Sequence, residues 1–240
     1  MKKTLIFSAL TFSLMSGFAQ GGKVMEEKNV QKRDLKGFHA IRISGGIDLY
    51  LSQSGSEAVA VSSNRNEDIA KIKTEVVDGV LNIYMDRDGW SWGSHGTQVL
   101  KAFVSCKVID ALKASGGSDI FFEDAVKGDK LALEITGGSD FRGKLEVREL
   151  TIHQTGGSDS YVSGTASTLS VHATGGSDLH GYELTTSDCH VEATGGSDVK
   201  ITVNKELSVS ATGGSDVTYR GNAVVRDQHT SGSSSVSRKG

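Results

Sequence analysis

Ala114-Ser-Gly-Gly-Ser-Asp119 opens a phrase that recurs through the second half of the chain and decides its fold. Five later copies read Thr-Gly-Gly-Ser-Asp and end at Asp140, Asp159, Asp178, Asp198 and Asp216. Successive aspartates are 21, 19, 19, 20 and 18 residues apart. A repeat near 20 residues that returns to the same turn residues is typical of a solenoid, in which each repeat stacks on its neighbours.

Apolar and polar residues alternate before each Gly-Gly pair. The fourth residue before the first glycine is always Leu, Ile or Val. The residue directly before that glycine is always Ser or Thr. This period of two predicts a strand with one buried face. The pattern resumes after the aspartate, so we expect two short strands in each repeat. They meet at a Gly-Gly-Ser-Asp corner, where glycine allows a left-handed backbone.

Two other repeat folds fit the pattern less well. A hairpin meander would reverse strand direction and shift the buried positions between units, and a helical repeat would need a period of 3.6 residues. We therefore predict an all-β fold, a parallel β-helix with about 20 residues per coil and Gly-Gly-Ser-Asp corners. Parallel crossovers are overwhelmingly right-handed, so a right-handed coil is expected.

The start of the chain is typical of an export signal. Met1-Lys2-Lys3 is charged, residues 5–14 are mostly apolar, and small residues end at Ala19, where cleavage is expected. The predicted organisation is a signal peptide over residues 1–19, a loose polar leader over 20–37 and a single β-helix domain over 38–240. Within that domain, residues 38–110 form less regular N-terminal coils and 111–240 form the regular repeats.

The N-terminal coils carry a weaker copy of the corner, Gly45-Gly46-Ile47-Asp48. Further on, Asp78-Gly79 lies between two apolar runs and predicts a tight hairpin. Less regular terminal coils are expected, because they must cap the open end of a solenoid.

These stretches resemble a known family. Phe38-His-Ala-Ile-Arg-Ile-Ser-Gly-Gly-Ile-Asp-Leu-Tyr-Leu51 and Thr74-Glu-Val-Val-Asp-Gly-Val-Leu-Asn-Ile83, followed by the Gly-Gly-Ser-Asp repeats, are similar to the head GIN domain family of proposed autotransporter adhesins. The resemblance covers roughly residues 38–239, and the family's Gly-Ile-Asn reads Gly46-Ile47-Asp48 here. It implies a pectin-lyase-like right-handed β-helix, export by a Gram-negative bacterium, a role in adhesion and no established catalytic residues.

The aspartate column is the most specific candidate site, and its members are Asp119, Asp140, Asp159, Asp178, Asp198 and Asp216. Stacked carboxylates about 5 Å apart would repel each other by about 1 kcal/mol per pair in water. The favoured explanation is a structural one, in which each carboxylate accepts hydrogen bonds from N–H groups of its own turn. The alternative is Ca²⁺ between the corners, although one aspartate per coil supplies few of the six to eight oxygens that Ca²⁺ takes. No other cofactor is expected.

Two further groups are weaker candidates. The outward column Glu134, His153, His172 and Glu192 is interpreted as sheet surface, with a transition-metal site as the alternative. Trp90, Trp92 and His95 lie in a Gly-rich loop that either caps the solenoid or binds a ligand, for instance a sugar ring or a partner protein. Cys106 and Cys189 lie several coils apart, too far for a disulfide, so two free buried thiols are predicted.

No catalytic motif stands out, because the corner serine recurs in every repeat whereas a nucleophile is needed once. Outward Lys113, Arg142, His180 and Lys200 supply no single base. A net charge of -3 gives no argument for nucleic acid, and no membrane span is expected after signal cleavage.

We therefore expect a non-enzymatic, exported adhesion or binding protein of the cell envelope, in the periplasm or on the outer surface. Its partner would be a cell-surface or extracellular polymer, either glycan or protein. The alternative is a glycan-binding module or a polysaccharide-active enzyme on the same fold. A polar face with aromatic ladders would favour glycan binding, and a groove with a metal and a buried base would favour an enzyme. Homo-oligomers through the solenoid ends are a third expectation.

Overall fold

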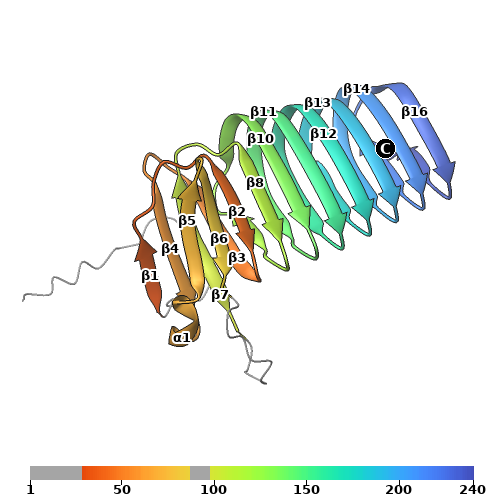
Figure 1. Cartoon of the computed structure of the whole chain (residues 1–240). Coiled ribbons are helices and arrows are strands. Elements are labelled where there is room, and N and C mark those ends of the chain that lie inside the picture. Colours follow the sequence, from red (N-terminus) through yellow and green to blue (C-terminus); the bar gives the residue numbers. More distant parts are fainter. Residues whose placement is uncertain (1–28, 87–97) are drawn as a thin grey trace, which may run out of the picture.

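Stacked β-coils make up the part of the chain that the computed structural model describes, residues 29–86 and 98–240 (Figure 1). The N-terminal elements are β1 (Val30–Arg33), β2 (Ala40–Ser44), β3 (Ile47–Gln53), β4 (Ala58–Ser63), α1 (Asn66–Ile69), β5 (Ile72–Val77), β6 (Val80–Met85), β7 (Leu100–Cys106), β8 (Ala111–Ser115) and β9 (Ile120–Phe122). The later elements are β10 (Val126–Thr136), β11 (Phe141–Gly156), β12 (Asp159–Gly175), β13 (Asp178–Gly195), β14 (Asp198–Gly213), β15 (Asp216–Arg220), β16 (Val224–Gly232) and β17 (Ser235–Arg238).

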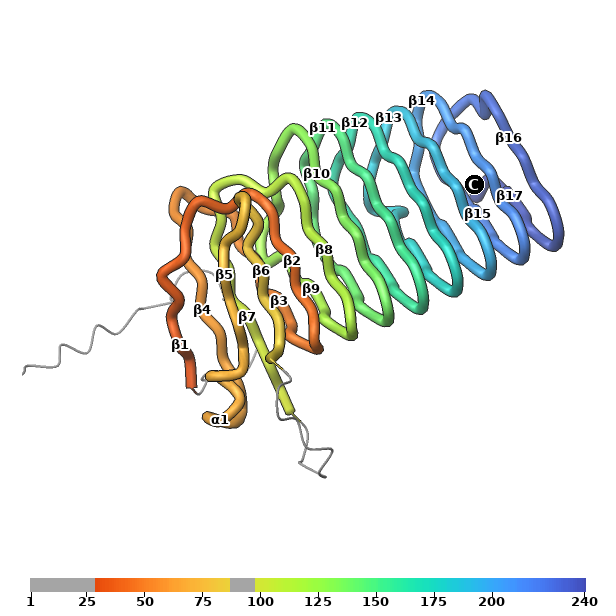
Figure 2. The backbone as a smooth tube through the Cα atoms, in the orientation of Figure 1, coloured from red at the N-terminus to blue at the C-terminus, as the bar shows by residue number. Residues whose placement is uncertain are grey.

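The regular coils are parallel and in register, which confirms the predicted stack (Figure 2). Asp159 pairs with Asp178, and Asp178 with Asp198, so equivalent residues lie directly above one another. The prediction of two short strands per repeat is wrong for β11 to β14. Each of these is one strand that runs from one corner almost to the next, because parallel pairing continues around the rest of the coil.

The first glycine of each corner is required by its conformation, and from Gly156 onward by space as well. Gly175 has a φ of +83°, and a Cβ there would lie 3.0 Å from the carbonyl oxygen of Gly156 in the coil before. Gly176 has no positive φ, and its Cβ would make an ordinary contact at 3.9 Å. Both glycines have a positive φ at the corners that start with Gly45, Gly116 and Gly137. The corner therefore needs glycine most at the position where two backbones come close.

Aliphatic columns fill the interior of the coils. Val171, Val191 and Leu207 are 0% exposed, and their neighbours in the regular columns, such as Ile152, Cys189 and Val209, are also buried. Gln154 is an exception, since it occupies a column held elsewhere by Ala or Ile. Its amide nitrogen donates to the backbone carbonyls of Ser158 and Asp178 at 3.0 and 3.1 Å, so one buried amide links two coils from the inside.

At the N-terminal end, the order of the coils differs from their order in the sequence. Strand β2 pairs with both β6 and β8, and β3 pairs with both β7 and β9. The chain thus forms the β2–β3 coil first, adds β6 and β7 on one side of it, and then crosses to add β8 and β9 on the other. Sequence analysis did not predict this insertion.

Antiparallel strands close that end of the stack. Strand β4 pairs antiparallel with β7, and β5 forms a hairpin with β6. The hairpin turn is Asp78-Gly79, with φ values of 50° and 76°, as its sequence predicted. Strand β1, which pairs with β4, lies inside the segment expected to be a loose leader. The domain therefore begins before Phe38, and the leader prediction is wrong for residues 30–33.

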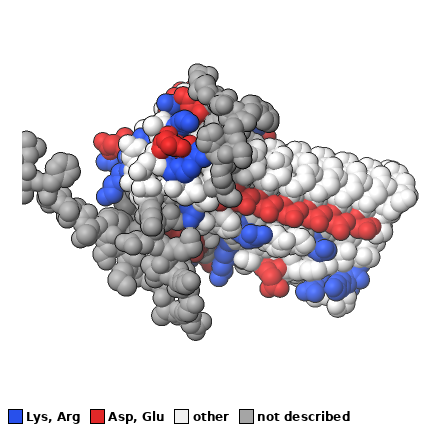
Figure 3. All heavy atoms as spheres, turned by 90° about the horizontal axis from the view of Figure 1, so that it is seen from below, with Lys and Arg blue, Asp and Glu red and all other residues white. Residues whose placement is uncertain are grey.

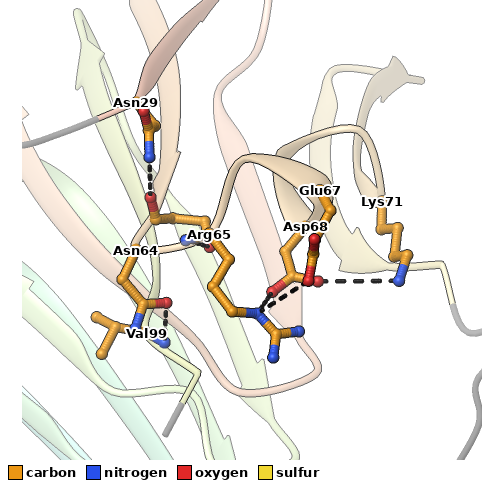
Figure 4. Close-up of polar contacts among 8 residues, drawn as sticks. Asn29, Asn64, Arg65, Glu67, Asp68, Lys71 and Val99 are labelled. Atoms are coloured by element: carbon orange, nitrogen blue, oxygen red, sulfur yellow. Dashed lines mark hydrogen bonds and ion pairs between the residues drawn. The ribbon is translucent and has the colours of Figure 1, made fainter. Parts of the chain in front are cut away.

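A polar cluster around α1 holds the loops of this end together (Figure 4). The Asp68 side chain is 0% exposed, and its Oδ2 accepts a hydrogen bond from Nε of Arg65 at 2.6 Å. That hydrogen bond lowers the pKa of the Asp68 carboxyl, so the buried group stays ionised. Nearby, Oδ1 of Asn64 accepts the N–H of Val99 at 3.0 Å and joins the helix end to the start of β7.

Strand β16, in the last coil, places polar residues in columns that are aliphatic elsewhere. Gln228 and Thr230 of β16 pair with Val209 and Ala211. Polar side chains in these positions make the open end of the stack less able to join a second copy. Homo-oligomers through the solenoid ends remain a prediction from the sequence. The polar side chains of β16 argue against contact through the C-terminal end.

Both cysteines are free and buried, as predicted. Burial raises the pKa of the Cys106 thiol to about 11, and it raises the pKa of the Cys189 thiol further still. Both side chains therefore act as small apolar residues of the core.

The two glycines of one corner supply a matched test of the stack. We expect Gly175→Ala to lower the free energy of unfolding by roughly 1–3 kcal/mol, because alanine is strained at positive φ and crowds the preceding coil. Gly176→Ala should change it by less than roughly 0.5 kcal/mol. Thermal and urea unfolding followed by circular dichroism measure both. Equal losses in the two variants would contradict the account of the corner.

Candidate functional site

A row of carboxylates runs along the corner edge of the regular coils. It consists of Asp48, Asp119, Asp140, Asp159, Asp178, Asp198 and Asp216, named here the aspartate row. Acidic side chains form a continuous line along these coils in Figure 3. The row includes Asp48, which the predicted column did not. The weak corner Gly45-Gly46-Ile47-Asp48 was the sequence signal that could have placed Asp48 in the row. The hydrogen bond from the Asp119 N–H to Asp48 Oδ1 at 3.4 Å shows that Asp48 stacks in register with the later aspartates.

Four of these carboxylates, Asp48, Asp119, Asp140 and Asp178, accept a hydrogen bond from a backbone N–H of the next coil and not from their own turn. Oδ1 of Asp119 accepts the N–H of Asp140 at 3.1 Å, Oδ1 of Asp140 accepts that of Asp159 at 3.2 Å, and Oδ1 of Asp178 accepts that of Asp198 at 3.3 Å. The expectation of bonds within one turn is therefore wrong here. The aspartates join coils, because the stacking distance brings each carboxylate to the N–H directly beyond it.

In the later corners, the buried serines make the bond within the turn instead. Ser177, Ser197 and Ser215 are 0% exposed, and each hydroxyl donates to the carbonyl of the threonine three residues before it. Their burial and repeated geometry agree with a structural role for this serine.

Burial and neighbouring like charges raise the pKa of two carboxyls in the aspartate row. Burial, followed by the charges of Asp140 and Asp178, raises the pKa of the Asp159 carboxyl. Burial and the charge of Asp119 raise the pKa of Asp48, although the hydrogen bond from Asp119 acts against this. Arg142 partly offsets the charge, since its Nη2 lies 3.9 Å from Oδ2 of Asp140.

A second outward row lies two residues beyond the aspartates, and sequence analysis missed it as a unit. In spatial order it contains Phe103, Tyr50, Phe121, Arg142, Tyr161, His180 and Lys200, named here the ring-and-cation row. The rings of Tyr161 and His180 stack at 4.4 Å, and the Arg142 guanidinium lies 4.9 Å from the Tyr161 ring centre. Tyr50 stacks between Phe103 and Phe121 at 5.3 and 5.1 Å. The faces of Tyr50 and Tyr161 are thus covered on both sides, and the rings present their edges outward.

The predicted outward column lies on the sheet before the corner. The rings of His153 and His172 stack with centres 4.5 Å apart, and burial together with the His172 charge lowers the pKa of His153. Glu192 contacts His172 and His190 at 2.9 and 3.1 Å, and these two bonds lower the pKa of its carboxyl. Glu134 lies beside His153 in register, but its side chain pairs with Lys113. The structure therefore joins His153, His172 and Glu192 through side-chain contacts and leaves Glu134 paired with a lysine.

Within residues 29–86 and 98–240, no group of three or more His, Cys, Asp or Glu side chains is arranged to hold a metal ion. A metal at the histidine column and Ca²⁺ at the aspartate row stay predictions from sequence. Trp90, Trp92 and His95 lie outside the described residues.

Comparison with known proteins identifies the family. The family described as "Putative auto-transporter adhesin, head GIN domain" matches residues 37–223. The chain belongs to this family. The resemblance noted from the corner sequences is thereby confirmed. No curated protein matches the chain.

Several solved structures share the fold. A "putative adhesin" from Bacteroides fragilis has a TM-score of 0.77 at 18% identity, over 88% of this chain and 96% of its own. One from Parabacteroides merdae has a TM-score of 0.66 at 19% identity, over 88% and 96%. A "putative lipid binding protein" from Parabacteroides distasonis has a TM-score of 0.66 at 15% identity, over 89% and 98%. At these identities the likeness shows the fold alone.

Among the described residues, no helix has the length and apolar character needed to cross a membrane.

The aspartate row predicts a specific pH dependence. Because the pKa of Asp159 is raised on folding, its ionised form opposes folding at neutral pH. The loss of folding stability that this carboxylate causes should shrink as the pH falls through the raised pKa toward the ordinary value near 4. Asp159→Asn should therefore raise the melting temperature slightly at pH 7, and this advantage should shrink at pH 4. Thermal melts of both proteins between pH 4 and pH 8 test this, and a variant less stable than wild type at pH 7 would contradict it.

Proposed function

We propose that this protein is a non-catalytic adhesion protein of the cell envelope that binds an extended cell-surface or extracellular polymer. The observation that carries the proposal is the in-register repetition of outward side chains. A ligand that repeats along its length can make the same contact on successive coils. Several weak contacts made together give a tight overall interaction, since later contacts form within an existing complex.

The rigidity of the stack supports this use. Four successive coils pair in register along nearly the whole length of β11 to β14, and their aspartates are bonded from coil to coil. A surface that is already ordered loses little conformational entropy on binding. Repetition also fits binding better than catalysis, because catalysis needs one set of residues in one place.

Membership of the adhesin family and the export signal expected over residues 1–19 support a place outside the cytoplasm. We propose the periplasm or the outer surface of a Gram-negative bacterium. Expression of the full chain in a Gram-negative host, followed by fractionation and mass spectrometry, should recover a protein that begins at Gln20 outside the cytoplasm. A cytoplasmic chain that keeps residues 1–19 would contradict this location.

The binding role is tested with a panel of immobilised polymers. Fluorescently labelled protein is applied to polysaccharides, extracellular matrix proteins and phospholipid vesicles, and bound polymers are then compared with their monomers. We expect binding to at least one polymer, and at least roughly a hundredfold weaker binding to its monomer, as multivalent contact implies. Heat-unfolded protein is the control.

Binding to none of the polymers, or equal affinity for polymer and monomer, would reject the proposal. Incubation of each bound polysaccharide with the protein, followed by a reducing-sugar assay, tests the enzymatic alternative. Steady release of new chain ends would reject the non-catalytic role.

A further inference from the structure

Four successive coils present two adjacent rows of polar side chains on the sheet that follows the corner. The aspartate row contributes Asp140, Asp159, Asp178 and Asp198, and the ring-and-cation row contributes Arg142, Tyr161, His180 and Lys200. Members of a row lie one coil apart, about 4.8 Å. In each coil the two side chains are two residues apart in extended backbone at the start of a strand, so they point to the same side of the sheet.

This pair of rows offers both acceptors and donors. Oδ1 of Asp178 accepts the N–H of Asp198, whereas within the described chain no hydrogen bond reaches its Oδ2. Arg142, Lys200, the Tyr161 hydroxyl and a ring nitrogen of His180 supply donors one row away. A ligand along the rows would therefore meet an acceptor and a donor in each coil, with a repeat close to the length of one extended pyranose unit.

The composition of the face favours one class of ligand. Arg142 and Lys200 in the second row offset part of the charge of the four aspartates, so the face is not a purely anionic strip of the kind that suits a polycation. Tyr161, 40% exposed, is the one large hydrophobic side chain exposed on β11 to β14 among the described residues, and His180 and Arg142 cover its ring faces. Protein interfaces are centred on buried apolar anchors. Rows of uncovered hydrogen-bonding groups instead match a chain rich in hydroxyl groups, which donate and accept in turn.

We propose that these two rows bind a neutral polysaccharide that lies along the solenoid axis, with about one sugar unit per coil. Ligand hydroxyls donate to the outer carboxylate oxygens and accept from the second row. Sugar rings do not stack on the aromatic faces, since other side chains already cover them. The inference rests on the proposed function and names its site and ligand class.

The test uses the whole protein and four soluble neutral polysaccharides: dextran, laminarin, hydroxyethyl cellulose and linear mannan. Affinity electrophoresis, in native gels that contain each polysaccharide, gives the dissociation constants. We expect wild type to bind at least one of them with little change between 0.15 and 0.5 M salt, because the contacts are mainly to neutral groups.

The variant Asp159→Asn/Asp178→Asn keeps the Oδ1 acceptors that join the coils but turns the outer oxygens into N–H donors. It should weaken binding at least roughly tenfold, because two charge-assisted hydrogen bonds are lost. The control Asp188→Asn/Asp227→Asn removes the same charge from the sheet before the corner and should stay within roughly twofold of wild type. Circular dichroism melts confirm that both variants fold.

Equal affinity of the row variant and wild type would overturn the inference, as would loss of binding in the control alone. Binding to cationic DEAE-dextran but not to dextran, abolished by 0.5 M salt, would show a simple electrostatic surface and also overturn it. If the polymer panel finds only a protein or a lipid surface and none of the four polysaccharides binds, the inference fails while the adhesion role stands.

Discussion

Parallel pairing of one coil on the next is the interaction on which the rest of the structure depends. Each regular coil bonds to its neighbours through the backbone along almost its full length, so equivalent residues are held one above another. This requires the corners to superpose as well. They do so because the first glycine of each corner takes a left-handed conformation, in which a side chain would be strained. From Gly156 onward its backbone also lies so close to the preceding corner that a Cβ would crowd it.

In-register stacking turns each sequence column into a row on the surface. Columns of Leu, Val and Ala become a continuous core, and polar columns become rows of identical or related side chains. A row of carboxylates would be unfavourable alone. It is tolerated because most of its carboxylates receive an N–H from the next coil, because partial exposure to water screens the charges, and because Arg142 lies beside it.

The same geometry explains why the aromatic row is a poor platform for sugar rings. At the spacing of β-coils, outward rings in one column stack on each other and on an intervening guanidinium, so their faces are used within the protein. The hydrogen-bonding edges, the Tyr161 hydroxyl and the outer carboxylate oxygens remain. An adhesion surface built in this way depends on hydrogen bonds and on repetition more than on apolar anchors.

The coil length, the buried columns and the corner positions follow from the sequence, because period-two alternation and recurrent Gly-Gly-Ser-Asp are local and repeated in every unit. The Asp78-Gly79 hairpin followed for the same reason. The insertion of the β2–β3 coil between β6–β7 and β8–β9 did not, since it depends on long-range pairing that leaves no local pattern. Which backbone N–H an aspartate carboxylate accepts could also be seen only in the folded stack. A carboxylate can reach its own turn or the next coil, and the distance between neighbouring coils selects the next coil.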